Sequence, residues 1–106
     1  MFKIKRICAV ATYGFILGMV LTHTAVAGDV KAGQEKSGVC GGCHGPDGIS
    51  FSPEIPNLKG QKEVYLAKAI GDYKSGARKN PMMSAMVGGL SETEIADLAA
   101  YFSSLK

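Results

Sequence analysis

Histidine and cysteine are scarce in this sequence, which has two histidines and three cysteines among 106 residues. Cys8 and His23 lie within positions 1–27, so the rest of the chain offers only Cys40, Cys43 and His44. A structural zinc site uses four ligands, usually cysteine or histidine. These three residues could therefore hold zinc only with a carboxylate or a partner chain as the fourth ligand.

Strand-like alternation of apolar and polar residues, internal repeats and low-complexity tracts are also missing. Apolar spacings of three and four residues are present instead, and they indicate helices. The sequence therefore predicts an all-α fold of three main helices and two long loops, residues 40–60 and 77–90. The expected helices are residues 28–39 with Asp29 as cap, residues 61–76 ending at Gly76, and a last helix that Ser91 and Glu94 open as a capping box.

Each of the two longer helices has a predicted apolar face. Side chains at these spacings lie on one side of a helix and pack into a core. The predicted faces are Val64, Leu66, Ala67, Ile70 and Tyr73 in the second helix, and Ile95, Leu98, Ala99, Phe102 and Leu105 in the last.

The segment at positions 1–27 has the layout of a secretory signal peptide. A basic start precedes an apolar run at positions 7–21, and small residues stand at positions 25 and 27. The alternative is a retained membrane anchor, but the run is shorter than the ~20 residues that a spanning helix needs. We therefore expect cleavage after Ala27 and an exported, periplasmic mature protein, residues 28–106, without membrane insertion.

Net charge is missing from this predicted mature chain. The whole sequence has a formal charge of +3, and positions 1–27 carry three basic residues and no acidic one, so positions 28–106 are formally neutral. A neutral chain gives no reason to expect nucleic acid as a partner. Residues 59–79 are nevertheless basic and the last helix is acidic, which indicates either solvated helix faces or a dipole that orients the protein toward an acidic partner.

The pentapeptide Cys40-Gly41-Gly42-Cys43-His44 is the attachment signature of c-type haem, C-x-x-C-H. In such a motif each thiol forms a thioether with a porphyrin vinyl group and the histidine binds the iron. A thioredoxin-like redox pair expects a βαβ context, and a Cys40–Cys43 disulfide would close a tiny loop and stabilise little. A domain as short as positions 28–106 has a small core that often needs such a staple, so we expect one haem c per chain, with iron.

Residues 28–106 resemble the class I cytochromes c, above all the short bacterial members and the single-haem units of two-haem cytochromes. The resemblance rests on CGGCHGPDG (40–48), PNLKGQ (56–61), YKSGAR (73–78), MMSAM (82–86) and LSETEIADLAAYFSSL (90–105). It implies that the Pro56 carbonyl accepts a hydrogen bond from the outer ring nitrogen of His44, and that Leu58 lies against the haem.

The resemblance also implies a close crossing of the first and last helices. There a small residue, Gly33 or Ala32, would face an aromatic ring, Tyr101 or Phe102. Ordinary core packing predicts the same contact, so the two interpretations coincide at this place.

Three methionines, Met82, Met83 and Met86, lie in the second predicted loop. A six-coordinate iron needs a second axial ligand, and the predicted mature chain has no second histidine. Most methionines simply fill gaps in a core. The resemblance implies Met83, eight residues before Ser91, as the ligand, with Met86 as the second choice and Met82 as the third.

These features predict a periplasmic electron-transfer protein that carries one electron on a His/Met-ligated haem. A thioether ligand raises the reduction potential, and two protein ligands leave no open position for a substrate, so we expect no enzymatic activity. The expected partners are redox proteins, an oxidoreductase or oxidase, that dock transiently at the haem edge. The alternatives are a fixed haem relay subunit of a larger oxidoreductase, and a haem sensor or weak peroxidase.

Overall fold

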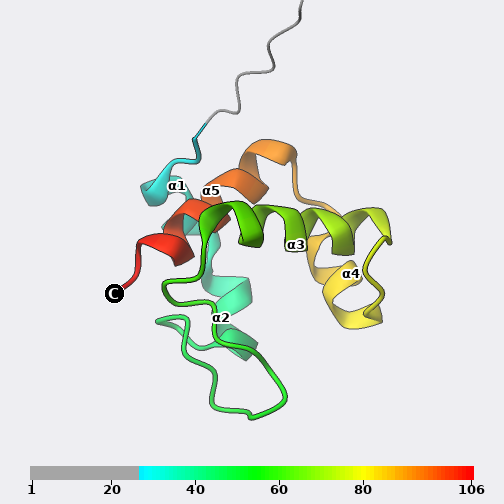
Figure 1. The fold of residues 1–106 in the computed structure, drawn as a ribbon, viewed down its shortest axis with the longest axis horizontal. Helices are drawn as coiled ribbons and strands as arrows, with labels where there is room; N and C mark the ends of the chain where they lie inside the picture. Colours follow the sequence, from blue (N-terminus) through cyan, green and yellow to red (C-terminus); the bar gives the residue numbers. More distant parts are fainter. Residues whose placement is uncertain (1–26) are drawn as a thin grey trace, which may run out of the picture.

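The computed structural model describes residues 27–106, and all regular structure in this part of the chain is α-helical (Figure 1). The predicted all-α fold is confirmed, but this part has five helices where three were expected. The predicted signal peptide lies outside the described residues, apart from Ala27. None of these helices is long and apolar enough to cross a membrane. They are α1 (Val30–Lys36), α2 (Gly38–His44), α3 (Glu63–Ser75), α4 (Pro81–Val87) and α5 (Glu92–Ser104).

The first expected helix is in fact two helices that meet at Ser37. The Ser37 N–H donates to the Gln34 carbonyl at 3.2 Å, while the Ser37 carbonyl accepts from the N–H groups of Cys40 and Gly41 at 3.0 and 2.9 Å. The prediction of a loop from Cys40 onward was therefore wrong for residues 40–44, which are helical. The helix was not predicted because it contains Gly41 and Gly42 and shows no apolar periodicity. It is defined by its backbone hydrogen bonds.

The second predicted loop also contains a helix, α4. Its N-cap is Asn80, whose side-chain oxygen accepts the Met83 N–H at 3.0 Å, and Pro81 occupies the first helical turn. Proline is favoured there because its missing N–H needs no partner. The prediction of a continuous loop over residues 77–90 was therefore wrong, and the Asn-Pro pair was the signal for it.

α1 crosses α5 at very close range. The backbone N–H of Asp29 donates to a carboxylate oxygen of Asp97 at 2.7 Å, and the Asp29 side chain caps α1 as predicted. Gly33 is buried at the crossing, where a Cβ would overlap the Asp97 carbonyl oxygen and lie 2.8 Å from the Cβ of Tyr101. The predicted contact of a small residue with an aromatic one is confirmed, with Gly33 and Tyr101 as the pair.

The core lies between α3 and α5. Its buried members are Leu66, Leu98, Ala99, Tyr101 and Phe102. This confirms the predicted face of α5 and its capping box, in which Ser91 and Glu94 each bond the other's backbone. Val64, however, is 83% exposed, because at 100° per residue it lies about 160° around the helix from Leu66.

Figure 1 shows how these contacts position the rest of the chain. α1 and α3 both pack on α5, and α4 packs on α3. α2 leads away from α1 toward the long loop of residues 45–62, which is drawn in green. In this view α2, with the cysteine–histidine motif, and α4, with the methionines, both lie below α3, α2 near the start of α3 and α4 near its end.

Candidate functional site

α2 carries both cysteines and the histidine of the motif. Cys40 and Cys43 are three residues apart, so their side chains share one side of the helix. Cys40 is half-buried and packs against the core cluster, whereas Cys43 is exposed, and both are free thiols. Burial raises the pKa of the Cys40 thiol, so this thiol stays protonated at neutral pH.

His44 is buried, with 8% of its surface exposed. Its Nδ1 lies 2.8 Å from the carbonyl oxygen of Pro56. Because a carbonyl can only accept, Nδ1 must carry the proton, and Nε2 then keeps a free lone pair. The hydrogen bond thus fixes the tautomer that can bind a metal through Nε2.

A folded loop brings Pro56 to His44. Gly45, directly after the histidine, has φ of +86°, where a side chain would be strained and would overlap the Ile49 carbonyl. Farther along, the Gly48 carbonyl accepts from the N–H groups of Leu58 and Lys59 at 2.8 and 3.0 Å. Leu58 packs against the core cluster. The loop therefore returns to α2 by the time the chain reaches Pro56.

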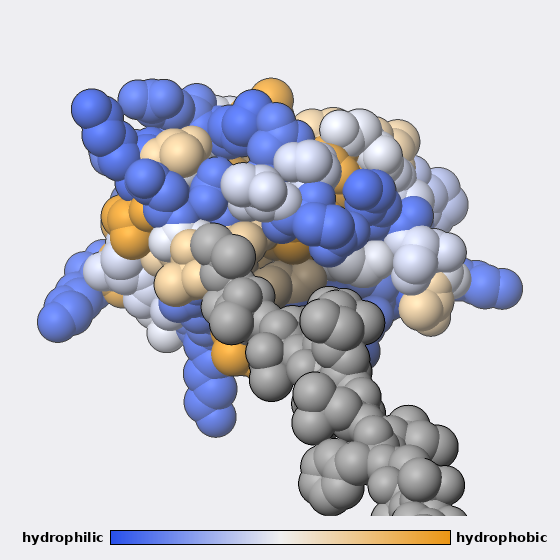
Figure 2. Space-filling model, turned by 90° about the horizontal axis from the view of Figure 1, so that it is seen from above, coloured by the Kyte–Doolittle hydropathy of each residue, from blue (hydrophilic) through white to orange (hydrophobic). Residues whose placement is uncertain are grey.

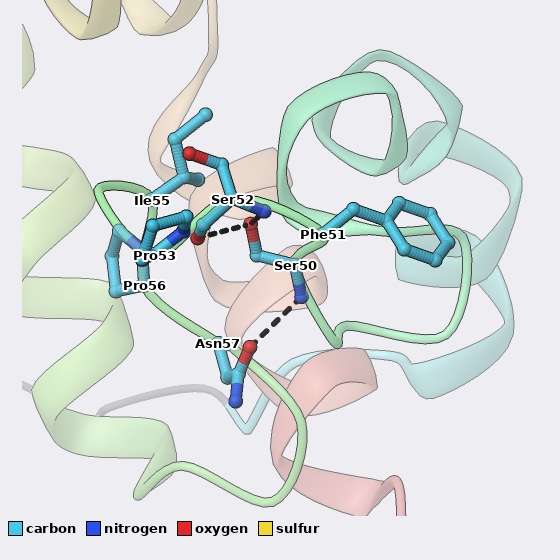
Figure 3. Close-up of a pocket in the computed structure, with 7 residues that line it drawn as sticks. All are labelled: Ser50, Phe51, Ser52, Pro53, Ile55, Pro56 and Asn57. Carbon is cyan, nitrogen blue, oxygen red and sulfur yellow. Dashed lines mark hydrogen bonds between the residues drawn. The ribbon is translucent and has the colours of Figure 1, made fainter.

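Two polar residues that the sequence analysis did not single out hold this loop together (Figure 3). The Ser50 N–H donates to the side-chain oxygen of Asn57 at 2.8 Å, and the Ser50 hydroxyl lies 3.3 Å from the Cys43 carbonyl. An open cavity of about 520 Å³ is lined by this segment, including Pro56. Phe51, which is 92% exposed, points away from the other labelled residues.

The three methionines differ in exposure. Met82 is 67% exposed and Met86 48%, whereas Met83 is half-buried. α4 is tied to α3 by the Ser84 hydroxyl, which donates to the Tyr73 carbonyl at 3.0 Å. Met83 is therefore the most enclosed thioether on this helix, and its assignment as a ligand stays a prediction.

Charged groups form pairs at the edges of the fold. Lys36 and Glu94 lie 2.6 Å apart and join α1 to α5, which raises the pKa of Lys36 and lowers that of Glu94, chiefly through their hydrogen bond. Lys68 pairs with Asp72 on α3, and Lys74 lies 4.0 Å from Glu92. The pairs of Lys68 and Lys74, which lie within the basic segment of residues 59–79, reduce the charge separation that a long-range dipole requires.

The donor set fits a covalently bound haem better than the other sites considered. Two free thiols on one side of α2 and an imidazole with a free Nε2 match the chemistry of haem c, and the Met83 thioether lies on a separate helix, α4. Over residues 27–106 no three His, Cys, Asp or Glu side chains converge on a metal site, so zinc gains no support. The part of the chain described also contains neither a strand nor a Cys40–Cys43 bond.

Comparison with known proteins agrees with this donor set. The family profile described as Cytochrome c matches residues 30–106. Cytochrome c4 of Pseudomonas aeruginosa is 48% identical over 92 residues, which cover 86% of this chain and 46% of that protein. Cytochrome c-554(548) of Halomonas halodenitrificans is 48% identical over 81 residues, which cover 74% of this chain and 98% of that protein.

The fold agrees as well. The crystal structure of reduced recombinant cytochrome c4 from Pseudomonas stutzeri matches with a TM-score of 0.72 and 47% identity, over 76% of this chain and 47% of that one. The chain thus spans about half the length of the cytochromes c4 that it matches. On the family match and the fold together, the chain belongs to the cytochrome c family, whose cofactor is covalently bound haem c.

Proposed function

We propose that this chain is a periplasmic carrier of single electrons, with haem bonded to Cys40 and Cys43 and ligated by His44 and Met83. The observation that carries the proposal is the hydrogen bond from His44 Nδ1 to the Pro56 carbonyl at 2.8 Å. This hydrogen bond leaves the lone pair of Nε2 free to bind a metal and holds the ring in one orientation. When bound, the haem supplies an iron that accepts and releases one electron.

The protein's own contribution is to bind, orient and enclose this group. Cys40 and Cys43 would attach it through thioether bonds, while Leu58 and the half-buried Met83 would offer apolar contacts that exclude water. If His44 and Met83 both ligated the iron, these two residues would leave no position open for a substrate. This favours a carrier over an enzyme, and the thioether favours the reduced iron.

Export belongs to the same proposal. Residues 1–27 would direct the chain to the periplasm and be removed, so that the working domain begins at Gly28. Its partners would be redox proteins that dock transiently at the haem edge. Figure 2 shows the molecule from above, the side away from α2 in Figure 1, and there hydrophilic residues surround small hydrophobic areas.

A second candidate function is that of a fixed relay unit within a larger assembly. The observation that favours it is the length of the cytochromes c4, in which a domain of this kind makes up about half of the chain. Purification of the native protein from the periplasm distinguishes the two functions. A carrier is recovered alone, whereas a relay subunit is recovered with its complex.

Covalent attachment and iron ligation are tested on the holoprotein. Acid extraction should leave the haem on the polypeptide, because thioethers survive when axial bonds do not. The ferric protein should show the weak far-red sulfur–iron band, and Met83→Ala should abolish it, lower the reduction potential and allow carbon monoxide or cyanide to bind.

Met86→Ala is the matched control, since it removes a neighbouring thioether from the same helix. It should leave the far-red band in place. Loss of the band in Met86→Ala instead would assign the ligand to Met86. A five-coordinate wild-type iron that binds carbon monoxide freely would favour a sensor or peroxidase over a carrier.

A further inference from the structure

α4 is too short to be stable by itself. It has seven residues, and isolated helices of fewer than about 12 residues are marginal in water. Its position must therefore come from specific bonds to its ends and to its neighbours. The structure shows three such bonds that fix the first turn of α4 and tie it to α3, and all three involve Met83 or Ser84 beside it.

Two of these bonds join Asn80 to the first turn of the helix. The side-chain oxygen of Asn80 accepts the backbone N–H of Met83 at 3.0 Å, and the backbone carbonyl of Asn80 accepts the N–H of Ser84 at 2.9 Å. Asn80 itself is extended, with φ −153° and ψ 113°, which is the usual N-cap conformation. The cap therefore fixes the backbone at the half-buried methionine.

The third bond anchors the helix to the core. The Ser84 hydroxyl donates to the Tyr73 carbonyl of α3 at 3.0 Å. Met83 is thus held from both sides, by the Asn80 cap before it and by the Ser84 anchor after it. Met82 and Met86 are 67% and 48% exposed, and neither receives the side-chain cap.

We propose that Asn80 is a positioning residue that holds the Met83 sulfur at the iron; this inference rests on the proposed function, in which Met83 is the second axial ligand. A thioether is a neutral ligand that ferric iron binds weakly. The fraction of iron that the sulfur occupies therefore depends on how well the protein backbone positions the sulfur in advance. When the cap is lost, the first turn of α4 frays and external ligands compete with the sulfur more successfully.

The test is cyanide titration of the ferric holoprotein, followed by the disappearance of the far-red sulfur–iron band. Asn80→Ala should lower the cyanide concentration at the midpoint about fivefold, which corresponds to the loss of one typical N-cap. Asn80→Ser keeps a capping oxygen and should stay within about twofold of wild type.

Ser91→Ala is the matched control, because Ser91 caps α5 through the same bond, to the Glu94 N–H at 3.1 Å. α5 carries no proposed ligand, so this variant should lose thermal stability while its cyanide midpoint stays at the wild-type value. An equal midpoint shift in Ser91→Ala would show that general destabilisation is the cause and would overturn the inference.

Two further results separate this inference from the function on which it rests. An unchanged midpoint in Asn80→Ala, with a normal wild-type band that Met83→Ala abolishes, overturns the positioning role alone. A wild-type protein without the band, or a band that persists in Met83→Ala, overturns the ligand assignment and the positioning role together.

Discussion

Substitution of Gly33 by alanine tests the crossing on which the fold depends. Gly33 faces the backbone of α5, and a Cβ at this position would overlap the Asp97 carbonyl oxygen and lie 2.8 Å from Tyr101 Cβ. Carbon atoms in contact normally stay about 3.5–4.0 Å apart. Gly33→Ala therefore forces α1 and α5 to separate by about 1 Å.

The expected cost is about 3 kcal/mol in the free energy of unfolding. Overpacking against a rigid backbone costs about 3 kcal/mol, and the separation also weakens the hydrogen bond from Asp29 to the Asp97 carboxylate, 2.7 Å long, worth about 1.5 kcal/mol. Alanine returns about 1 kcal/mol because it favours a helix more than glycine does. For a domain of this size the change lowers Tm by about 12–24 °C.

The assay is denaturant and thermal unfolding of the holoprotein, followed by circular dichroism. Gly71→Ala is the matched control, because Gly71 also lies inside a helix but a Cβ there would meet nothing within 4 Å apart from the backbone of its own helix and its chain neighbours. It should be slightly more stable than wild type, by about 1 kcal/mol or less. Equal stability of Gly33→Ala and Gly71→Ala would refute the argument that the crossing excludes a side chain.

Three other predictions concern the charges, the loop and the leader. Lys36→Met should flatten both ends of the pH profile of stability. Because the pKa of Glu94 is lowered, its carboxylate stabilises the fold above its usual pKa of 4.5, and this stabilisation is lost as acid protonates it. Because the pKa of Lys36 is raised, its ammonium stabilises the fold below its usual pKa of 10.5, and this stabilisation is lost as base deprotonates it. A wild-type profile that already matches that of Lys36→Met would contradict this pairing. Asn57→Ala should cost about 1 kcal/mol and speed exchange of the His44 ring N–H in NMR spectra, since it frees the Pro56 segment; unchanged exchange would show that Asn57 does not hold the loop. Intact mass of periplasmic protein should match haem plus a chain that starts at Gly28, and recovery of residues 1–27 in the mature protein would contradict cleavage.

The features best predicted from sequence are those with a strong local signal. The capping box at Ser91 and the apolar stripe of α5 were both correct, because side-chain caps and helical periodicity act within one or two turns. The Asp29 cap was correct for the same reason, and Gly76 does end α3 in a left-handed conformation. The all-α class followed directly from these elements.

The short helices could not be found in that way. α2 contains two glycines between its cysteines and almost no apolar residues, so its helical state depends on backbone bonds from Ser37 and on the packing of Cys40. The only sequence signal for α4 is the pair Asn80-Pro81 at its start. This pair was passed over because attention went to the three methionines that follow as candidate ligands. Val64 was misplaced because it lies two positions before Leu66, about 160° around the helix, and so cannot share the face of Leu66.

The proposed ligands also differ in how strongly the local sequence indicates them. Cys40, Cys43 and His44 were proposed from one short motif, whereas the choice of Met83 came from resemblance and not from chemistry that the sequence displays. The polar residues Ser50, Asn57 and Ser84 escaped the sequence analysis because each bonds a partner seven or more positions away in the chain.

The α1–α5 crossing also has a consequence for the order of folding. The contact between Asp29 and Asp97 joins positions far apart in the chain, and a contact at such separation forms slowly because loop closure costs conformational entropy. Cys40 lies inside that loop and packs against a core cluster to which α5 contributes most members, so a chain with local helices but without this contact leaves the Cys40 thiol unpacked. The last helix, which carries none of the proposed haem ligands, therefore helps to bury the Cys40 thiol, whereas Cys43 stays exposed in the folded chain.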